Sequence, residues 1–308
     1  MTTSTALVSI IVPVRNGRDD LRGLLASLAA QTLPQDRFEV VIADDGSTDG
    51  GTDGLATPDG HVRVYPGPPV SSYVARNRAV SHARGQVLAF TDADCRPEPD
   101  WLESGLAALG DGGVVAGLIR FRLPERPTIW SLIDVDTFLD QERQVKAGVA
   151  VTANLFLNRE LFERIDGFDE ELREFGDHDL VGRCVAAGAE LRFTASAVVV
   201  HPTRDEGSRY LSKFWTMNRW YGAREALAGR KPDGIRLQAW VPLVRTFRTR
   251  RWYGRTLTGI DRRRLDVSGR APRLIDDLRA LPVIYILQPY VASIAQLVGW
   301  WSAVRSAS

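Results

Sequence analysis

The stretch "VLAFTDADC" (residues 87–95) decides the fold. Four apolar residues lead directly into two carboxylates, Asp92 and Asp94, which are separated by one alanine. A short apolar run that ends in polar residues is typical of a buried strand. Side chains two positions apart on an extended chain point to the same side, so the pattern predicts that both carboxylates project together from the end of a strand.

The segments before this stretch alternate between strand and helix patterns. Predicted strands are "LVSIIVPV" (7–14), "FEVVIADD" (38–45) and "VRVYP" (62–66), and predicted helices cover residues 19–31 and 73–84. Gly85 is placed to end the second helix as its C-terminal cap. Such alternation indicates an α/β fold, in which a mostly parallel sheet is covered by helices on both faces. The ligand crevice of this kind of sheet lies beyond the carboxyl ends of its strands, where Asp92 and Asp94 are expected.

The same alternation continues as far as residue 203. Predicted helices cover residues 101–110, 158–172 with a break at Gly167, and 177–190, and predicted strands lie within residues 111–123 and 191–202. Residues 125–147 show no single pattern.

The composition is that of an ordinary globular protein. The 308 residues, 44% hydrophobic and 25% charged, are enough for one large domain with an appendage. The two cysteines, Cys95 and Cys184, are too few for a disulfide framework or a four-thiolate zinc site, which favours a reducing compartment. The first residues lack the basic stretch of a secretory signal, so we expect a cytoplasmic location.

Charge is distributed unevenly along the chain. Residues 1–203 hold 19 basic and 30 acidic side chains, residues 204–280 hold 19 basic and 8 acidic ones, and residues 281–304 hold none. The basic segment and the uncharged one, with Trp300 and Trp301, favour peripheral or single-pass contact with the inner face of the cell membrane. The alternative is that residues 281–304 form a buried helix pair that packs on the rest of the protein. Nucleic acid is not expected as a partner, because no recognition motif accompanies the basic residues and the acidic part would repel it.

The two aspartates of "DAD" need a neutralising partner. Adjacent anions repel, and a Mg²⁺ or Mn²⁺ ion between them and a polyanionic ligand would offset that cost. The alternative is that one aspartate caps a helix and the other is solvated. "ADDGSTDG" (43–50) ends another strand with Asp44 and Asp45, and by itself this segment is typical of a tight turn. The chain has neither GxGxxG nor GxxxxGK[ST], so a dinucleotide fingerprint and a P-loop are both excluded.

Taken together, the motifs resemble those of a known family. "VSIIVPVRN", "VIADDGSTDG", "ARNRAVSHARGQVLAFTDADC", "TANLFLNRELFERIDGFDEEL" and "FGDHDLVGRCVAAG" are similar, in this order, to the motifs of glycosyltransferase family 2, inverting enzymes with a GT-A fold. The resemblance covers residues 7–203. It implies a Rossmann-like, mostly parallel mixed sheet flanked by helices in a catalytic domain at 1–203. A basic helical extension (204–280) and an apolar C-terminal segment (281–308), membrane-interacting or packed, would follow it.

The resemblance also implies roles for individual residues. Asp94 would be the closer metal ligand, with His201 completing the metal and diphosphate site; read alone, His201 is a strand-end residue with an ordinary hydrogen bond. Asn154, in the expected helix and loop "TANLFLNRE" (152–160), would lie by the acceptor. The residues implied for the nucleotide sugar are Pro13, Val14, Arg15, Asp44, Asp45, Arg76, Asp92 and Asp94.

The position of the catalytic base needs a separate comparison. The family often has Glu-Asp-X-Asp at the start of a helix, whereas this chain has "FGDHDL", with Gly176 at the glutamate position. The resemblance then makes Asp177 the general base, with Asp179 as the fallback if the loop is shifted by one residue. Read alone, Asp177 is a helix cap, and His178 is expected to be exposed and incidental.

The function implied is that of a hexosyltransferase or related glycosyltransferase. It would move a sugar from a UDP-, dTDP- or GDP-sugar to a glycan or lipid-linked acceptor hydroxyl in cell-envelope, polysaccharide or glycolipid synthesis. One alternative is a catalytically inactive nucleotide-sugar-binding protein, which Gly176 leaves open. The other is a nucleotidyltransferase of similar sheet topology, but its Gly-rich loop after the first strand is not found in "VPVRNGRDD".

Overall fold

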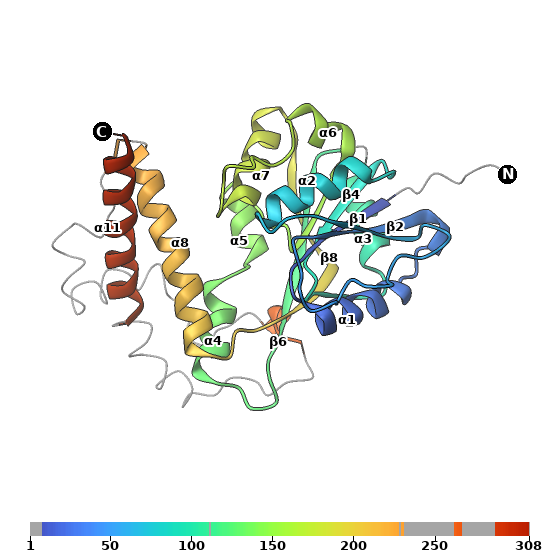
Figure 1. Ribbon diagram of the computed structural model, residues 1–308, viewed down its shortest axis with the longest axis horizontal. Helices are drawn as coiled ribbons and strands as arrows, with labels where there is room; N and C mark the ends of the chain where they lie inside the picture. Colours follow the sequence, from blue (N-terminus) through green and yellow to red (C-terminus); the bar gives the residue numbers. More distant parts are fainter. Residues whose placement is uncertain (1–7, 111, 228, 231–261, 267–286, 308) are drawn as a thin grey trace. The chain divides into compact units, whose positions relative to one another are not determined.

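The computed structural model describes residues 8–110, 112–227, 229–230, 262–266 and 287–307 (Figure 1). The chain divides into two compact units, which are described separately below. The first unit holds residues 1–120 and 139–202, and the second holds residues 121–138 and 203–308. Much of the segment 204–280, and residues 281–286, lie outside the described residues. The sequence boundaries at 203 and 280 stay predictions.

One mixed sheet forms the centre of the first unit. The eight described strands lie in the order β3-β2-β1-β4-β7-β6-β8-β5. Strands β1 to β4 pair in parallel, whereas β7 runs antiparallel to β4 and β6, and β5 antiparallel to β8. The strands are β1 (Val8–Val14), β2 (Phe38–Asp44), β3 (Val62–Pro66), β4 (Val87–Thr91), β5 (Arg96–Pro97), β6 (Val114–Arg122), β7 (Asn154–Asn158) and β8 (Leu191–Pro202). The mixed sheet of the GT-A fold is confirmed.

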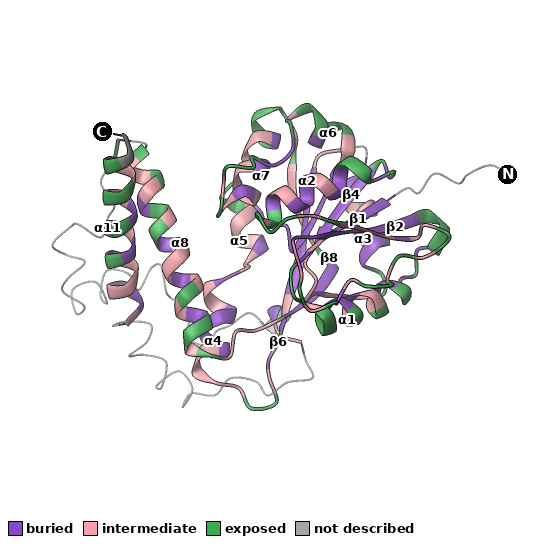
Figure 2. Ribbon diagram, viewed as in Figure 1, coloured by how far each residue is buried: buried purple, intermediate pink, exposed green. Residues whose placement is uncertain are grey.

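Helices cover both faces of this sheet, as expected. Val8, Ile10 and Val12 of β1 pack in one apolar cluster with α1 and α3, whereas Ile11 packs in a second cluster with α2, α6 and α7. This alternation buries the strands on both sides (Figure 2). The helices are α1 (Arg18–Ala29), η1 (Gln35–Arg37), α2 (Ser72–His82), α3 (Trp101–Leu109), α5 (Gln141–Lys146), α6 (Arg159–Arg164) and α7 (Gly176–Ala186).

Two local predictions are wrong. Helix α2 ends at His82 with an extended Ala83, so Gly85 is not its cap. A Cβ atom on Gly85 would lie 2.5 Å from the backbone nitrogen of Ser9, so this glycine permits close approach of two backbones instead. Residues around Asn154, expected as a helix and loop, form strand β7 between β4 and β6. The predicted helix 158–172 is shorter than expected, because α6 ends at Arg164 and residues 165–172 are not helical; the turn expected at Gly167 is present, with a φ of +64°.

The second unit is helical in its described part. It contains α4 (Ile129–Thr137), α8 (Gly207–Leu227), the short η5 (Arg262–Arg264) and α11 (Gln288–Ala307). Helices α8 and α11 pack closely at Gly222 and Gly299, which have no side chain to keep the backbones apart. A Cβ atom on either glycine would lie 1.9 or 1.7 Å from a carbonyl oxygen of the opposite helix. An ion pair joins Arg204 to the buried Asp134 at 3.0 Å. Within the described residues, no helix combines the length and the apolar character needed to cross a bilayer.

Candidate functional site

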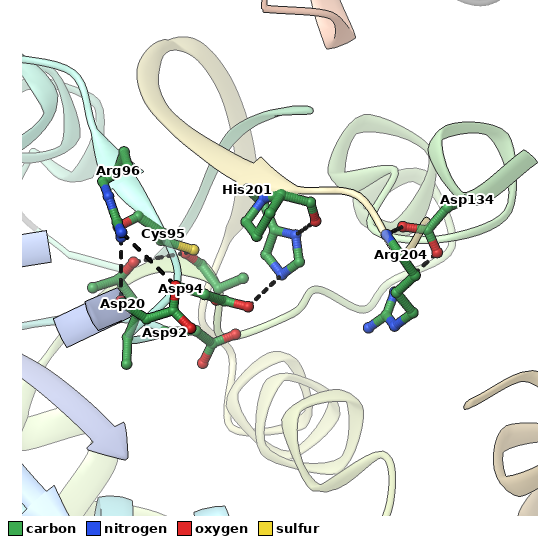
Figure 3. A network of polar contacts seen from close by, with 12 residues as sticks. Asp20, Asp92, Asp94, Cys95, Arg96, Asp134, His201 and Arg204 are labelled. Carbon is green, nitrogen blue, oxygen red and sulfur yellow. Dashed lines mark hydrogen bonds and ion pairs between the residues drawn. The ribbon is translucent and has the colours of Figure 1, made fainter. Parts of the chain in front are cut away.

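The two aspartates of the "DAD" stretch lie in a turn and not on an extended strand. Strand β4 ends at Thr91, and the backbone N–H of Cys95 donates to the carbonyl of Asp92 at 3.0 Å. The turn gives each carboxylate a different partner, but the two remain close enough for the charge of Asp92 to raise the pKa of Asp94. Asp92 accepts a hydrogen bond from Arg76 at 2.6 Å, whereas Asp94 faces His201 (Figure 3).

Asp94 is a half-buried carboxylate that is incompletely neutralised. Its Oδ2 lies 3.5 Å from Nε2 of His201, and its buried Oδ1 has no hydrogen-bond partner among the described residues. Burial raises the pKa of Asp94; His201 opposes the shift, and the negative charges of Asp92 and Asp20 add to it. A cation at this position would remove the cost that these effects place on the charged form.

His201, near the end of β8, is oriented as a metal-binding histidine would be. Its Nδ1 lies 2.6 Å from the carbonyl oxygen of Pro202. A carbonyl oxygen only accepts, so Nδ1 carries the hydrogen, and Nε2, the ring nitrogen that faces Asp94, is the one that a cation could bind once it has no proton. A hydrogen bond from the other ring nitrogen to a carbonyl typically fixes the tautomer of a metal-binding histidine. The ordinary strand-end hydrogen bond, which was the alternative for His201, is thus present as well.

The pair Asp94 and His201 fits a divalent cation that the substrate helps to hold. Two atoms 3.5 Å apart can both bind one ion at about 2.1 Å, and Mg²⁺ sites often use one or two protein groups together with substrate phosphates. No group of three or more His, Cys, Asp and Glu side chains in the described part of the chain forms a complete cage. The residues therefore fit an open site and not a closed structural one.

The ends of β1 and β2 lie side by side at the same edge. Val14 pairs in register with Asp44, and the N–H of Asp45 donates to the carbonyl of Val14 at 2.8 Å. The Asp45 carboxylate accepts from the N–H of Val70 at 2.9 Å. Arg15 is exposed and makes no hydrogen bond or ion pair with a described residue, and Pro13 is half-buried. These positions line the edge, but their contact with a nucleotide stays a prediction.

Asp44 shapes the loop that follows it. Its two oxygens accept hydrogen bonds from the N–H of Ser47 and the hydroxyl of Thr52, both at 2.7 Å. Burial acts to raise the pKa of Asp44, but these hydrogen bonds outweigh it and the pKa is lowered. The turn that was the alternative for this segment is observed.

Arg76 is buried beneath the site. It is 4% exposed, pairs with Asp92, and has its guanidinium 6.0 and 5.9 Å from the ring centres of Tyr73 and Phe168. The arginine thus orients Asp92, and Tyr73 and Phe168 are residues that the sequence reasoning missed. Direct contact between Arg76 and a nucleotide stays a prediction.

The structure distinguishes the two candidate bases on α7. Asp179 is paired with Arg183 at 2.8 Å, and Arg183 also donates to the carbonyls of Ile165 and Gly167. Asp177 accepts only the neighbouring N–H of His178 at 3.0 Å and has no ion pair with a described residue. Asp177 is therefore the carboxylate that remains available to a ligand. His178 is half-buried with its ring 5.0 Å from that of Phe175, so the expectation that it is exposed is wrong.

Tyr73 explains the glycine at the start of α7. A Cβ atom on Gly176 would lie 2.8 Å from a ring carbon of Tyr73, which leaves no room for a glutamate in this arrangement. Burial and the nearby Asp177 carboxylate raise the pKa of the Tyr73 phenol, which Arg76 partly opposes. The glycine in place of an expected glutamate was the signal that could have pointed to a bulky neighbour.

Asn154 does not lie where an acceptor could reach its side chain. It is 0% exposed, accepts from Trp101 Nε1 at 2.9 Å, and donates to the carbonyls of Leu118 and Ala197 at 2.9 Å each. These three hydrogen bonds join β7 to its neighbours. We correct the acceptor assignment accordingly and treat Asn154 as part of the sheet.

Comparisons with known proteins show the family of the chain. Residues 9–166 match the family model of Glycosyl transferase family 2. The chain is 32% identical over 222 residues to "Glycosyltransferase AglE" of Haloferax volcanii, which covers 70% of this chain and 73% of that protein.

Solved structures show the same fold. The mannosyltransferase PcManGT of Pyrobaculum calidifontis, in complex with GDP-Man and Mn²⁺, superposes with a TM-score of 0.62 at 20% identity, covering 98% of this chain and 88% of that one. GalNAc-T7 with UDP, GalNAc and Mn²⁺ has a TM-score of 0.56 at 18% identity, covering 79% of this chain and 54% of that one.

Proposed function

Because the chain belongs to glycosyltransferase family 2 and is a glycosyltransferase with a nucleotide-sugar donor, we propose that it transfers the sugar with inversion through a metal-assisted site. The observation that supports this most is the division of its carboxylates between two elements. Asp94, beside His201, has a buried oxygen without a hydrogen-bond partner among the described residues, and Asp177 on α7 has no ion pair with any of them. Asp94 and His201 would suit the departing diphosphate, and Asp177 would suit the attacking hydroxyl of the acceptor.

Asp94 and Nε2 of His201 would hold Mg²⁺ or Mn²⁺ against the diphosphate of the donor. When bound, such an ion stabilises the negative charge that develops on the departing nucleoside diphosphate. Arg76 fixes Asp92 through its 2.6 Å hydrogen bond, which leaves the second carboxylate oxygen of Asp92 for a ribose hydroxyl. Pro13, Val14, Arg15, Asp44 and Asp45 would form the rest of the nucleotide site at the edge of β1 and β2.

Asp177 is proposed as the general base. Its carboxylate accepts the proton of the acceptor hydroxyl as that oxygen bonds to the anomeric carbon, while the bond from this carbon to the diphosphate oxygen breaks and its electron pair leaves with the nucleotide. A single displacement of this kind inverts the anomeric centre. Tyr73, packed against Gly176, supports the start of α7 from which Asp177 projects.

The nucleotides bound in similar structures suggest which donors to test, and the basic segment 204–280 suggests a class of acceptor. The neighbouring structures carry GDP-Man and UDP, so GDP-, UDP- and dTDP-sugars are the donors to test first. A glycan or lipid-linked acceptor at the inner face of the cell membrane would suit the basic segment 204–280, because each basic residue near anionic lipid contributes about 1 kcal/mol. Trp301 of α11 is 55% exposed and would suit the same interface.

The mechanism is tested by a matched pair of substitutions on one helix. Asp177→Asn is expected to keep donor affinity and to lower kcat by about 10² or more, as for loss of a general base. Asp179→Asn removes an equal charge two residues away and is expected to retain most of kcat. Transfer is measured with GDP-, UDP- and dTDP-sugars and Mn²⁺. Full turnover by Asp177→Asn would remove this residue from the mechanism, and absence of wild-type turnover with every donor would favour an inactive binding protein.

A further inference from the structure

The two candidate metal ligands are placed by two strands that are hydrogen-bonded to each other, since Asp94 lies in the turn just before β5 and His201 lies on β8. The short strand β5 pairs antiparallel with β8, with Arg96 opposite Val200. Asp94 comes two residues before Arg96, and His201 comes directly after Val200. The position of Asp94 relative to His201 therefore depends on how the turn between β4 and β5 is held.

The side chain of Arg96 holds this turn. Its Nη1 donates to the carbonyl of Cys95 at 2.8 Å and to that of Ala93 at 3.3 Å, which are the carbonyls on either side of Asp94. Its Nη2 lies 3.9 Å from Oδ1 of Asp20 on α1 (Figure 3). The guanidinium is a planar group with several donors, so it can bridge two carbonyls and a carboxylate at once. The side chain is only 21% exposed, which limits its freedom to move.

Gly23 of helix α1 makes room for this guanidinium. A Cβ atom on Gly23 would lie 2.2 Å from Nη2 and 2.4 Å from Cζ of Arg96. Glycine is a poor helix former, and here it stands inside a helix of 12 residues. The glycine does not stabilise the helix, but the position of the Arg96 guanidinium against α1 requires a residue without a side chain here.

We propose that Arg96, seated over Gly23, is a positioning residue that holds the turn of Asp92 to Cys95 so that Asp94 can bind a divalent cation together with His201. The inference rests on the metal site of the proposed function. Arg96 acts through the backbone on both sides of Asp94, and it is not itself a ligand. A partner of this kind is expected to change metal affinity by about 10-fold to 100-fold when it is lost.

Gly23→Ala separates positioning from folding. Alanine is the better helix former, so the variant is expected to keep or raise the melting temperature of the protein. Its methyl group would nevertheless displace the guanidinium of Arg96 from the two carbonyls. We therefore expect the Kd for Mn²⁺, measured by calorimetry with saturating UDP or GDP, to rise about 10-fold or more in a protein that is no less stable.

Three further variants complete the experiment. Arg96→Met is expected to raise the Kd for Mn²⁺ as Gly23→Ala does, and Arg96→Lys to recover part of the loss. The double variant of Gly23→Ala and Arg96→Met is expected to bind no more weakly than Arg96→Met alone, because both changes remove the same contact. Arg192→Met is the control, since Arg192 likewise donates to two carbonyls, of Leu109 and Gly112, at 2.9 and 2.8 Å, in another turn of the same unit. It should leave the Kd for Mn²⁺ unchanged.

The outcomes distinguish this inference from the function on which it rests. If the wild type does not bind Mn²⁺ in the presence of either nucleotide, the metal site and the role of Arg96 are both overturned. If the wild type binds Mn²⁺ and Gly23→Ala binds it equally well, only the role of Arg96 is overturned. The same holds if Arg192→Met weakens Mn²⁺ binding as much as Arg96→Met does.

Discussion

Adding one methyl group at the start of α7 should disturb both stability and catalysis. In Gly176→Ala the new Cβ would lie 2.8, 2.9 and 2.9 Å from three ring carbons of Tyr73, whereas ordinary contacts begin at 3.4 Å. The ring cannot move away freely, because it stacks on Phe168 at 5.6 Å and lies beneath Arg76. Overpacking of this kind typically costs about 1–3 kcal/mol, and the better helix propensity of alanine offsets up to about 1 kcal/mol of it.

The two effects leave an expected loss of about 1–2 kcal/mol in the free energy of unfolding, measured by urea denaturation. Because Asp177 follows Gly176 directly, a shift of the helix start should also lower kcat by about 10². Tyr73→Leu in the same chain should relieve the overlap, so the double variant should be more stable than the sum of the single changes predicts. Additive stabilities in this cycle, or a Gly176→Ala variant as stable and active as the wild type, would refute the reasoning.

Two other predictions concern single residues of the first unit. The pKa of Asp44 is lowered from its ordinary value of 3.8, so the stability that this carboxylate contributes is present above that pH and is lost as the pH falls through the folded-state pKa. Asp44→Asn should therefore reduce the fall in the free energy of unfolding at acid pH. An unchanged acid dependence would contradict this prediction. Asn154→Ala leaves the Trp101 N–H and the carbonyls of Leu118 and Ala197 without their hydrogen-bond partner. The free energy of unfolding, measured by urea denaturation, should therefore fall by about 3 kcal/mol or more. A stable variant with a raised KM for the acceptor would instead return Asn154 to the acceptor site.

The first half of the sheet was predictable because its sequence is unambiguous. β1, β2 and β4 are short apolar runs followed by polar residues, and a helix pattern lies between each pair, so the periods of strand and helix alternate clearly. β7 gave no such signal: "NLFLN" has three apolar residues between two asparagines. Its assignment depends on the gap between β4 and β6 that it fills, which is a property of the tertiary structure.

The sequence predicted which residue types form the candidate site, but it did not predict which of them contact each other. Asp94 and His201 are brought together by the pairing of β5 with β8, and no spacing in the sequence reports that register. The ion pair of Arg76 with Asp92 depends on how α2 packs beside the end of β4. The resemblance already placed Asp177 before Asp179 as the base, and the ion pair of Asp179 with Arg183 has the i,i+4 spacing that a helix pattern can indicate.

In the proposed mechanism Asp94 and His201 hold a cation against the diphosphate of the donor. The most direct measurement is the affinity of UDP and GDP for the wild type, Asp94→Ala and His201→Ala, by calorimetry with Mn²⁺ and with EDTA. We expect Mn²⁺ to strengthen nucleotide binding to the wild type, and we expect this dependence to disappear in Asp94→Ala and to weaken in His201→Ala. Equal nucleotide affinity with and without Mn²⁺ in the wild type, or an unchanged Mn²⁺ dependence in Asp94→Ala, would contradict it.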